Sequence, residues 1–545
     1  MTLFKQILTA RGLTTRAARQ AFLQPDYMAV KHDPFLLPDM KKAVARLKQA
    51  REQGEKIVIY GDYDIDGLSA TALLLDAFGK FGFEDVDAFI PNRFVEGYGM
   101  TMGAVDKVRD MGAGLIVTVD TGSLCHAEIA YAASLGIDTV VTDHHNVAET
   151  PPPSVAAVNP KFPGHTYPFR DLCGAGVAFK LVQALQTELD GLPDGYEKWL
   201  LDLVALGTVC DIVTLADENR ANVYWGLEVL KKQQRPGLKA LMAVAGIEPE
   251  QVNARHLGFG LGPRMNAAGR LETAQHALDM LVARDGLAAL EASEKLEELN
   301  VKRRIIQDAI FEEACVQAEQ LADDRVLVVS SDGWNHGVIG IVASKLVEKY
   351  KKPVFIIGER GEEATGSARS FGDFSAADAV RAADDIIIKG GGHGAAAGVT
   401  LATGKIGDFR QRVNEFYDSL QLTNQERYLL PRADVEIDDF LEIDEELVAN
   451  LAKMEPFGNG NPEPVLKITR SSVLSMRRMG ADWQHVKLAL RDKNGKVLQM
   501  LAFNAPEEFF REPGDEVVVW FQPTINEWQG VRTVEGRLLH ILLLD

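Results

Sequence analysis

The stretch IVIYGDYDIDGLSATALL, residues 57–74, constrains the fold of this chain more than any other. Its β-branched and aromatic start, residues 57–60, predicts a buried strand. Asp62, Asp64 and Asp66 follow at alternate positions, and the apolar sequence after them predicts a helix. Three carboxylates so close together repel one another unless a cation or a partner neutralises them. The stretch is therefore a strand, an acidic loop that needs neutralising, and a helix.

A calcium-binding EF-hand also begins D-x-D-x-D-G, so this alternative must be tested first. An EF-hand needs a helix before the loop and a bidentate Glu at the twelfth loop position. Counted from Asp62, the twelfth position is Leu73, and a strand precedes the loop. The EF-hand interpretation therefore fails.

Length and composition bound the class of protein. The chain has 545 residues, 46% hydrophobic and 25% charged, which favours roughly three or four soluble globular domains. No apolar run reaches membrane-spanning length, and the N-terminal sequence lacks the apolar core of a signal peptide. The four cysteines are scattered without a C-x-x-C pair, which favours free thiols in a reducing cytoplasm: Cys125, Cys173, Cys210 and Cys315. The net charge of −20 argues mildly against a nucleic-acid partner, but a local basic track would suffice for one.

Short strands and helices alternate in the first part of the chain, which predicts a parallel sheet with covering helices. The expected strands are 57–61, 86–90, 115–119 and 138–142. Mainly helical sequence follows to about 285. Residues 287–332 contain neither Gly nor Pro, and their apolar stripe predicts one long helix to about 322, roughly 50 Å in length.

Two further patterns follow this helix. A second α/β pattern occupies 325–420, beginning with the strand RVLVVSS. From about 460, five short strands in about 80 residues predict a small barrel or sandwich.

Acidic and histidine side chains follow the strands of the predicted first sheet. Asp120 ends the third strand, Asp143, His144 and His145 end the fourth, and Asp211 lies in the apolar segment LGTVCDIVTL. Because ligands of open α/β sheets bind beyond the carboxyl ends of the strands, we expect these groups to meet. Oxygen ligands with imidazole and without thiolate favour Mn²⁺ or Mg²⁺ over zinc. So many carboxylates predict two ions that share an Asp, an arrangement suited to phosphoryl transfer.

The motifs GDYDIDG, VTVDTG and VTDHH, with Asp211 beyond them, resemble the DHH phosphoesterase superfamily. Further motifs resemble the RecJ family, bacterial single-strand-specific 5′→3′ DNA exonucleases: PNRFVEGYG, GPRMNAAGR, DGWNHGVIGIVASKL, GSARS, GGGHGAAAG and EPFGNGNPEPVL. The resemblance covers nearly the whole chain. It implies an α/β fold: a parallel-sheet DHH domain with N-terminal helices (1–285), a long connecting helix (286–324), a smaller α/β DHH-associated domain (325–425) and a C-terminal OB-fold β-barrel (426–545). Larger family members continue past this barrel, so we expect no further C-terminal module.

The resemblance also implies roles at the metal site. Asp64 and Asp120 would bind one ion, and the other would be bound by Asp66, Asp120, His144 and Asp211. His145, next to Asp143, would face the scissile phosphate in catalysis. Many superfamily members have a His where this chain has Tyr60, so Asp62 is expected to supplement the first ion.

Candidate nucleic-acid-binding residues lie in three parts of the chain. Arginine suits phosphate because its planar fork binds bidentately, and the resemblance implies that several arginines anchor a 5′-terminal phosphate. Small residues around a histidine let a phosphate backbone approach closely. In the barrel, aromatic and cationic side chains near hairpins suit stacking of unpaired bases. The candidates are Arg93, Arg264, Arg270, Ser367, Arg369, Gly391, Gly392, His393, Arg477, Arg478, Trp483 and Trp528.

The resemblance implies a monomeric, cytoplasmic, metal-dependent exonuclease of single-stranded DNA in repair and recombination, with a helicase and a single-strand-binding protein as partners. Two alternatives stay open: a phosphodiesterase of short oligonucleotides or cyclic dinucleotides, and a non-catalytic replication scaffold. The first would act on dinucleotides only, and the second would bind no metal.

Overall fold

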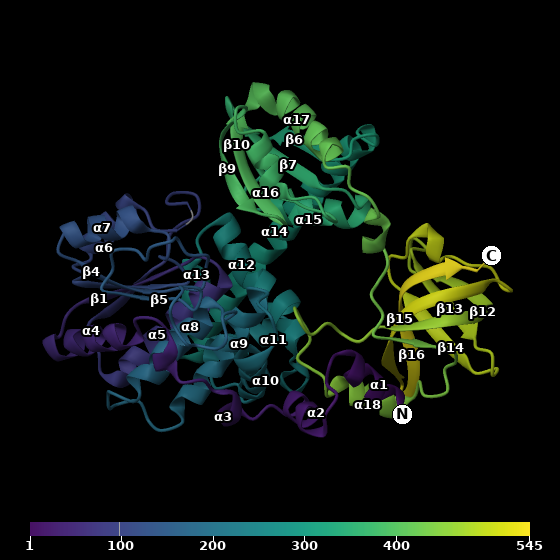
Figure 1. Cartoon of the computed structure of the whole chain (residues 1–545), viewed down its shortest axis with the longest axis horizontal. Helices are drawn as coiled ribbons and strands as arrows, with labels where there is room; N and C mark the ends of the chain where they lie inside the picture. The colour runs from purple at the N-terminus through teal and green to yellow at the C-terminus, as the bar shows by residue number, and fades with distance from the viewer. Residues whose placement is uncertain (98, 545) are drawn as a thin grey trace.

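The computed structural model of the protein describes residues 1–97 and 99–544. Tyr98, within the motif at 91–99, lies outside the described residues. The ribbon forms three lobes in chain order: a first lobe on a parallel sheet, a second lobe on a mixed sheet, and a β-barrel (Figure 1). Among the described residues, none of the helices combines the length and apolar content that crossing a membrane requires.

The sheet of the first lobe is parallel, with the order β2-β1-β3-β4-β5. Its central strands are rich in Val and Ile and buried on both faces, as a helix-covered parallel sheet requires. The strands are β1 (Ile57–Gly61), β2 (Val86–Phe89), β3 (Leu115–Val119), β4 (Asp138–Thr142) and β5 (Ala156–Val158). The four strands predicted from the sequence are confirmed, and β5 is an addition.

Alternate residues of these strands enter two different hydrophobic clusters. Ile57 and Ile59 pack with one group of helices, whereas Val58 and Tyr60 pack with another. The first group is α4 (Met40–Gln53), α5 (Ile65–Phe81) and α8 (Gly174–Leu185). The second group is α6 (Met102–Asp110) and α7 (His126–Ser134). The carboxyl edge of the sheet stays free to carry polar groups.

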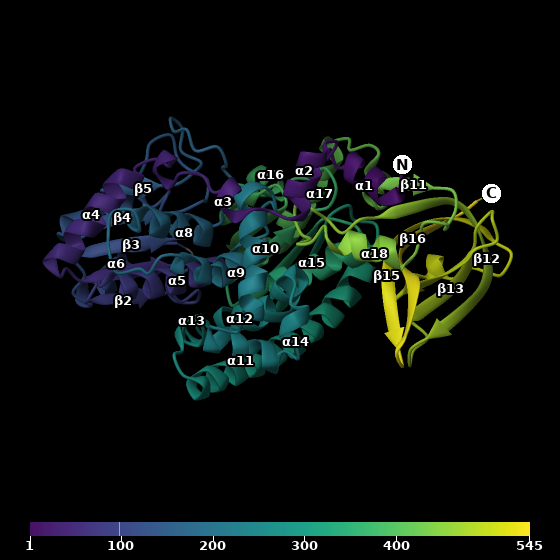
Figure 2. The same ribbon diagram turned by 90° about the horizontal axis from the view of Figure 1, so that it is seen from below.

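A helical part completes the first lobe (Figure 2). Its α-helices are α3 (Tyr27–Val30), α9 (Leu201–Cys210), α10 (Asp217–Lys231), α11 (Pro236–Val244), α12 (Gly262–Leu271) and α13 (Gln275–Val282), whereas α2 (Arg16–Leu23) packs its Phe22 and Leu23 against the barrel core. Shorter turns are η1 (Pro34–Leu36), η2 (Tyr196–Leu200), η3 (Pro249–Gln251) and the π-helical η4 (His256–Leu261). Helix α9, which ends just before Asp211, packs on α5, α8 and α10.

The long helix α14 (Gly286–Gln320) confirms the prediction of a strut between two lobes. Asp285 caps its first turn by accepting hydrogen bonds from the amides of Leu287 and Ala288. Near its start Leu296 belongs to the core of the first lobe, and further along Ile310 belongs to the core of the second. One rigid element therefore fixes the two lobes relative to each other.

The second lobe has the mixed sheet order β6-β7-β8-β10-β9. Its first two strands are parallel and the rest pair antiparallel. The strands are β6 (Leu327–Asp332), β7 (Val354–Arg360), β8 (Glu363–Arg369), β9 (Ile387–His393) and β10 (Ala396–Ala402). The helices are α15 (Ile339–Tyr350), α16 (Ala376–Ala382) and α17 (Ile406–Ser419), with the short turns η5 (Thr403–Lys405) and η6 (Gln425–Tyr428).

Five strands close the C-terminal barrel, because β12 pairs with both β13 and β15. They are β12 (Leu466–Met479), β13 (His485–Arg491), β14 (Val497–Ala502), β15 (Glu516–Trp528) and β16 (Val531–Leu543), and β11 (Val435–Ile437) lies parallel beside β12. The remaining elements of this lobe are α18 (Glu445–Ala452) and η7 (Glu507–Phe509). Helix α1 (Leu3–Ala10) also contributes Leu3, Ile7 and Leu8 to the barrel core, so both termini lie on this lobe (Figure 1).

Candidate metal centre and nucleic-acid interface

The first acidic group lies where β1 passes into α5. Asp64 is the N-cap of α5 and accepts hydrogen bonds from the amides of Asp66 at 2.9 Å and Gly67 at 3.1 Å. Asp62 and Asp66 are buried, and Asp64 is half-buried. Capping explains why an aspartate stands at position 64, but it leaves the carboxylates at 62 and 66 to be explained.

Asp66 is held in place by backbone amides. Its two oxygens accept hydrogen bonds from the amides of Gly174 at 2.5 Å and Ala175 at 2.8 Å, at the N-terminus of α8. A Cβ on Gly207 of α9 would lie 2.4 Å from Asp66 Oδ1, so only glycine lets α9 approach this closely. Helices α8 and α9 therefore both pack closely against the Asp66 carboxylate.

Asp120 follows β3 and is the buried centre of the site. Its φ of +61° is uncommon for a residue other than glycine and turns the chain sharply after the strand. A Cβ on Gly174 would lie 2.5 Å from the Asp120 Cβ, so glycine is again required for close approach. The backbone at Asp120 therefore adopts an unfavourable conformation that places its carboxylate in the site.

The two histidines after β4 have different environments. Asp143 Oδ1 accepts hydrogen bonds from the amides of His144 and His145 and lies 2.9 Å from His145 Nδ1. Asp143 Oδ2 accepts from the amide of Ser123. Asp143 therefore orients the turn that carries His144 and His145 (the histidine turn), and both of its carboxylate oxygens already accept hydrogen bonds. His144 Nε2 points into the acidic group, 3.0 Å from Asp120 Oδ1, 3.5 Å from Asp211 Oδ2 and 3.8 Å from Asp66 Oδ2.

Three overlapping groups of side chains have ligand atoms within 4.8 Å of one another. They are Asp62 with Asp64 and Asp120, Asp66 with His144 and Asp211, and Asp120 with His144 and His145. Asp120 belongs to two of these groups, as expected of a residue that bridges two ions. The structure thus brings together the six metal ligands expected from the sequence and His145, while Asp143 lies behind them against His145.

Burial and mutual repulsion hold the carboxyl groups of this centre partly neutral without a cation. Burial and the charge of Asp64 raise the pKa of Asp62 to about 7 and that of Asp66 to about 6. Burial and the charge of Asp66 raise the pKa of Asp211 to about 8 and the pKa of Asp120 well above its ordinary value. Such shifts mark a site that a cation would stabilise.

The histidines titrate in opposite directions. Burial and the neighbouring His145 lower the pKa of His144 to about 4, so its ring is neutral, as a metal ligand must be. Burial lowers the pKa of His145, but the hydrogen bond with Asp143 and the charges of Asp143, Asp211 and Asp62 together outweigh it and raise that pKa to about 9. Among the described residues, Asp120 Oδ1 and His144 Nε2 are buried and lie 3.0 Å apart, yet neither atom makes a hydrogen bond. These orphaned atoms and the oxygen-rich donor set fit a hard divalent cation such as Mn²⁺ or Mg²⁺.

Tyr60, at the position where superfamily members often have a histidine, is buried in β1. Its hydroxyl donates to the carbonyl of Gly99 at 3.1 Å. Asp62 is the nearby group that joins Asp64 and Asp120. This arrangement suits the expectation that Asp62 supplements the first ion.

Several candidate phosphate-binding arginines gather into one cluster. Burial and the charges of Arg93, Arg303 and Arg369 lower the pKa of Arg270 to about 10. Arg93 stacks 4.3 Å from the centre of the Tyr63 ring, and its Nε is buried without a hydrogen-bond partner among the described residues. Like charges brought together this closely favour an anionic ligand.

The second lobe contributes Ser367 and Arg369 from the end of β8, and Arg369 donates to the Ser367 hydroxyl at 3.3 Å. Arg264 behaves differently, because it pairs with Glu297 of α14 at 2.5 Å. The glycine-rich stretch forms a hairpin, in which Gly391, Gly392 and His393 end the exposed edge strand β9. An edge strand leaves every other amide unpaired, so this hairpin can still donate to a phosphate.

The barrel presents its candidate residues to solvent. Trp483, in the turn between β12 and β13, is 61% exposed, and Trp528, at the tip of the β15–β16 hairpin, is 71% exposed. Arg477 and Arg478 are exposed on β12, and Arg478 lies over the ring of Phe510. Neither tryptophan is part of the barrel core, which leaves both rings free to stack on a ligand.

Arg303 is the residue of the arginine cluster that the sequence analysis missed. It is buried on α14 and donates hydrogen bonds to Asn300 at 2.5 Å and Gln307 at 2.6 Å. The signal was available, since Arg303 falls on the apolar stripe formed by Leu296, Leu299 and Ile310. A charged side chain on the apolar face of a helix becomes buried, and a buried charge needs a hydrogen-bonding or oppositely charged partner.

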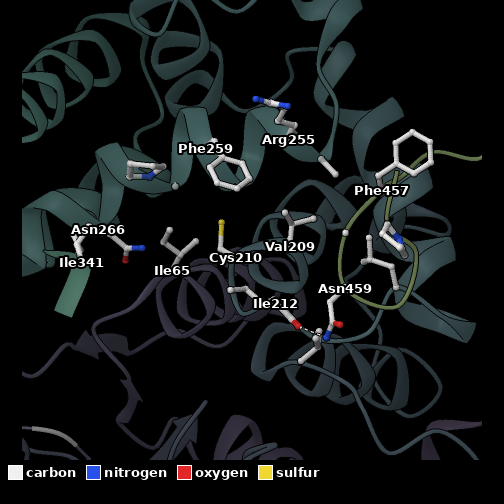
Figure 3. Close-up of a pocket in the computed structure, with 18 of the residues that line it drawn as sticks. Ile65, Val209, Cys210, Ile212, Arg255, Phe259, Asn266, Ile341, Phe457 and Asn459 are labelled. Atoms are coloured by element: carbon white, nitrogen blue, oxygen red, sulfur yellow. Dashed lines mark hydrogen bonds between the residues drawn. The ribbon is translucent and has the colours of Figure 1, made fainter. Parts of the chain in front are cut away.

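A largely apolar cavity of about 600 Å³ is lined in part by the sequence neighbours of Asp64, Asp66 and Asp211 (Figure 3). Its lining includes Ile65, Cys210 and Ile212 from the first lobe, Ile341 from the second, and Asn459 from the segment before the barrel. The cavity therefore touches all three lobes next to Asp211.

The fold and the site define a metal-dependent phosphoesterase of the DHH type. A family model described as "DHH family, N-terminal domain" matches residues 56–208, and one described as "DHHA1 domain" matches residues 323–419. A third, "RecJ OB domain", matches residues 433–540.

Curated relatives and a solved structure cover the chain almost completely. It is 35% identical to the single-stranded-DNA-specific exonuclease RecJ of Dickeya dadantii, over 93% of this chain and 91% of that one. It is 39% identical to RecJ of Bacillus subtilis over 96% of this chain, and spans 66% of that protein's length. The crystal structure of RecJ with Mn²⁺ from Thermus thermophilus superposes with a TM-score of 0.83 at 30% identity, covering 99% of this chain and 76% of that one. The chain belongs to the RecJ family.

Proposed function

We propose that this protein is a single-stranded-DNA-specific exonuclease that hydrolyses DNA from the 5′ end and releases 5′-mononucleotides. The observation that carries the proposal is the meeting of three overlapping ligand groups at the carboxyl edge of the first sheet. The membership in the RecJ family supplies the substrate class. DNA repair and recombination are the processes we propose for it.

The proposed ligands of one ion are Asp62, Asp64 and Asp120, and those of the other are Asp66, Asp120, His144 and Asp211. Bound together, two divalent ions would supply an activated water and positive charge for phosphoryl transfer. The protein contributes the geometry, since the amides of Gly174 and Ala175 fix Asp66, and Asp143 fixes the histidine turn.

His145 is proposed to face the scissile phosphate. The hydrogen bond with Asp143 and the charges of Asp143, Asp211 and Asp62 keep a proton on the ring, because together they raise the pKa of His145 to about 9 against the effect of burial. A protonated imidazole beside the phosphate stabilises developing negative charge and can donate a proton to the leaving oxygen.

The arginine cluster is proposed to set the polarity of cleavage. Arg93, Arg270 and Arg369, with Ser367, would anchor a 5′-terminal phosphate and the next backbone phosphate, because bidentate arginine suits both. Arg264 and the hairpin residues Gly391, Gly392 and His393 would contact the backbone nearby. With the terminal phosphate anchored, the metal centre acts at a fixed distance from the 5′ end.

The barrel is proposed to hold the unpaired strand that leads to the site. Exposed Trp483 and Trp528 would stack on bases, while Arg477 and Arg478 would follow the backbone. We further propose that the protein works as a cytoplasmic monomer alongside a helicase and a single-strand-binding protein. The four free cysteines agree with a reducing compartment.

The decisive experiment is digestion of end-labelled DNA in the presence of Mn²⁺ or Mg²⁺. Substrates should include single-stranded and blunt double-stranded DNA, each with a 5′-phosphate or a 5′-hydroxyl, and a dinucleotide. We expect mononucleotides from the 5′ end of the single strand and no digestion of the blunt duplex. Cleavage of the dinucleotide alone would refute the proposal.

A further inference from the structure

The loop that carries Asp211 is held in an unfavourable backbone conformation. Ile212, the next residue, has a φ of +61°, which is a genuine outlier for a β-branched side chain. Its side chain is 69% exposed, so core packing does not enforce this conformation. Asp211 itself ends α9 with its amide bonded to the carbonyl of Gly207, so the strain lies in the residue directly after it and needs contacts from elsewhere to persist.

Asp171 and Asn219 of the first lobe hold Thr214 in the middle of this loop, whereas the contacts at Ile212 and Leu215 come from the segment before the barrel. Asn459 Nδ2 donates to the carbonyl of Ile212 at 2.8 Å (Figure 3). The amide of Leu215 donates to the Asn459 carbonyl, also at 2.8 Å. One residue, 247 positions away in sequence from Ile212, thus holds the loop at both ends.

The glycines on either side of Asn459 permit this approach. A Cβ on Gly458 would lie 2.8 Å from Leu215 Cδ1, and a Cβ on Gly460 would lie 2.5 Å from Thr214 Cγ2. Gly460 also has a φ of +76°, which other residues rarely adopt. The sequence FGNGNP is therefore shaped to lie against residues 212–215.

The segment is itself fixed to the first lobe. Arg220 of α10 donates hydrogen bonds to the carbonyls of Met454, Glu455 and Pro456, and has no carboxylate among these partners. Asn461 Nδ2 donates to the carbonyls of Met454 and Pro456. We name residues 454–461 the docking segment. Because Arg220 ties this segment to the first lobe and Asn461 closes it by internal hydrogen bonds, Asn459 acts from a fixed position.

We propose that Asn459 is a positioning residue of the metal centre: by holding the strained loop at Ile212, it keeps Asp211 beside His144 and Asp66. The inference rests on the proposed function, since it assigns Asp211 to the second ion. It also means that the metal centre is complete only when the docking segment of the C-terminal lobe is seated on the first lobe.

The test measures Mn²⁺ binding directly, by calorimetry and by the electron paramagnetic resonance signal of free Mn²⁺, on the full chain. Asn459→Ala should weaken the site that contains Asp211 by roughly fivefold, the factor for one hydrogen bond of ordinary net strength, and leave the other site unchanged. Asn459→Asp keeps the side-chain volume but loses the donor, and gives the same readout if the alanine variant fails to fold. The matched control is Asn450→Ala on α18, whose side chain accepts an exposed hydrogen bond from Lys453.

A rescue variant separates positioning from a merely structural role. Glycine adopts φ near +60° without penalty, so Ile212→Gly should restore most of the lost Mn²⁺ affinity in the Asn459→Ala background. Unchanged affinity in Asn459→Ala, equal weakening of both sites, or failure of the glycine to restore affinity would each overturn the inference. If the wild-type protein bound no Mn²⁺, the proposed function would fail instead, so the two failures are distinguishable.

Discussion

Replacing Asp120 by asparagine should make the metal-free protein more stable at alkaline pH and abolish its response to metal. Asparagine tolerates a φ of +61° and has nearly the size of aspartate, so the backbone is preserved. The change removes one negative charge from the middle of the metal centre. Both effects follow from the same feature, a set of buried carboxylates that repel one another without a cation.

The magnitude follows from the spacing of the ligand atoms. Oxygens of Asp62 and Asp64 lie within 4.8 Å of Asp120, and each such pair of charges repels by about 3 kcal/mol at an effective dielectric constant of about 20. A carboxyl whose pKa is raised in the folded state destabilises that state as pH increases from its unfolded pKa through its folded pKa. Asp62, with a pKa raised to about 7 by burial and Asp64, and Asp211, with a pKa raised to about 8 by burial and Asp66, place this window between about pH 4 and pH 8.

Thermal unfolding in EDTA at pH 6 and pH 8.5 tests the reasoning. At pH 8.5 the first unfolding transition of Asp120→Asn should lie above that of the wild type by roughly 12 °C, for about 6 kcal/mol of repulsion relieved in the two pairs. At pH 6 the difference should shrink, because neighbouring carboxyls are partly protonated. Mn²⁺ at a hundred times its Kd should stabilise the wild type by about 2.7 kcal/mol and the variant little.

The control is Asp39→Asn, which makes the same change at a φ of +50° on the N-cap of α4, where the carboxylate pairs with exposed Lys42. It should leave the response to both pH and Mn²⁺ unchanged. A metal-free Asp120→Asn protein no more stable than the wild type at pH 8.5, or one that retains the full Mn²⁺ shift, would refute the argument.

Three further outcomes are expected. The apparent affinity for Mn²⁺ should rise between pH 6 and pH 8.5, because burial and Asp66 raise the pKa of Asp211 to about 8 and this ligand must lose its proton before it binds the ion. Calorimetry in two buffers measures the protons released, and an affinity independent of pH would contradict this expectation. Arg369→Ala should reduce kcat/KM for 5′-phosphorylated strands by roughly 100-fold and remove their advantage over 5′-hydroxyl strands, as expected for the loss of a charge-assisted contact of about 3 kcal/mol. If the variant still prefers 5′-phosphorylated strands, the 5′-phosphate must bind at other residues. Trp483→Ala and Trp528→Ala should each weaken binding of single-stranded DNA by about 1–3 kcal/mol, measured by fluorescence anisotropy, and leave Mn²⁺ binding unchanged. Unaltered DNA affinity in both variants would show that the barrel does not contact the DNA strand.

Local patterns in the sequence were sufficient for most of the fold. Strands β1 to β4, the long helix α14 and the five barrel strands appear where hydrophobic periodicity predicts them, because period and burial are properties of neighbouring residues. The candidate ligands could also be selected, since parallel strands deliver their ends to one edge. The sequence could not show that the glycine-rich stretch 390–398 is an edge hairpin, because glycine fits a tight turn and a close-packed strand equally well.

The sequence could not show which side chains from distant segments contact one another. Arg264 and Arg270 lie six residues apart in one motif, yet one pairs with Glu297 and the other faces Arg93, Arg303 and Arg369. Nothing in their local sequence distinguishes them, since the difference depends on which helix packs where.

By itself the sequence determined the kinds of elements, their order and the chemistry of the metal ligands, since each of these follows from residues close together in the chain. Only the tertiary structure decided how far apart the ligand atoms lie, how strongly burial perturbs their protons, and that Asn459 reaches the strained turn after Asp211. These depend on contacts between residues hundreds of positions apart, and such contacts exist only once the whole chain has packed.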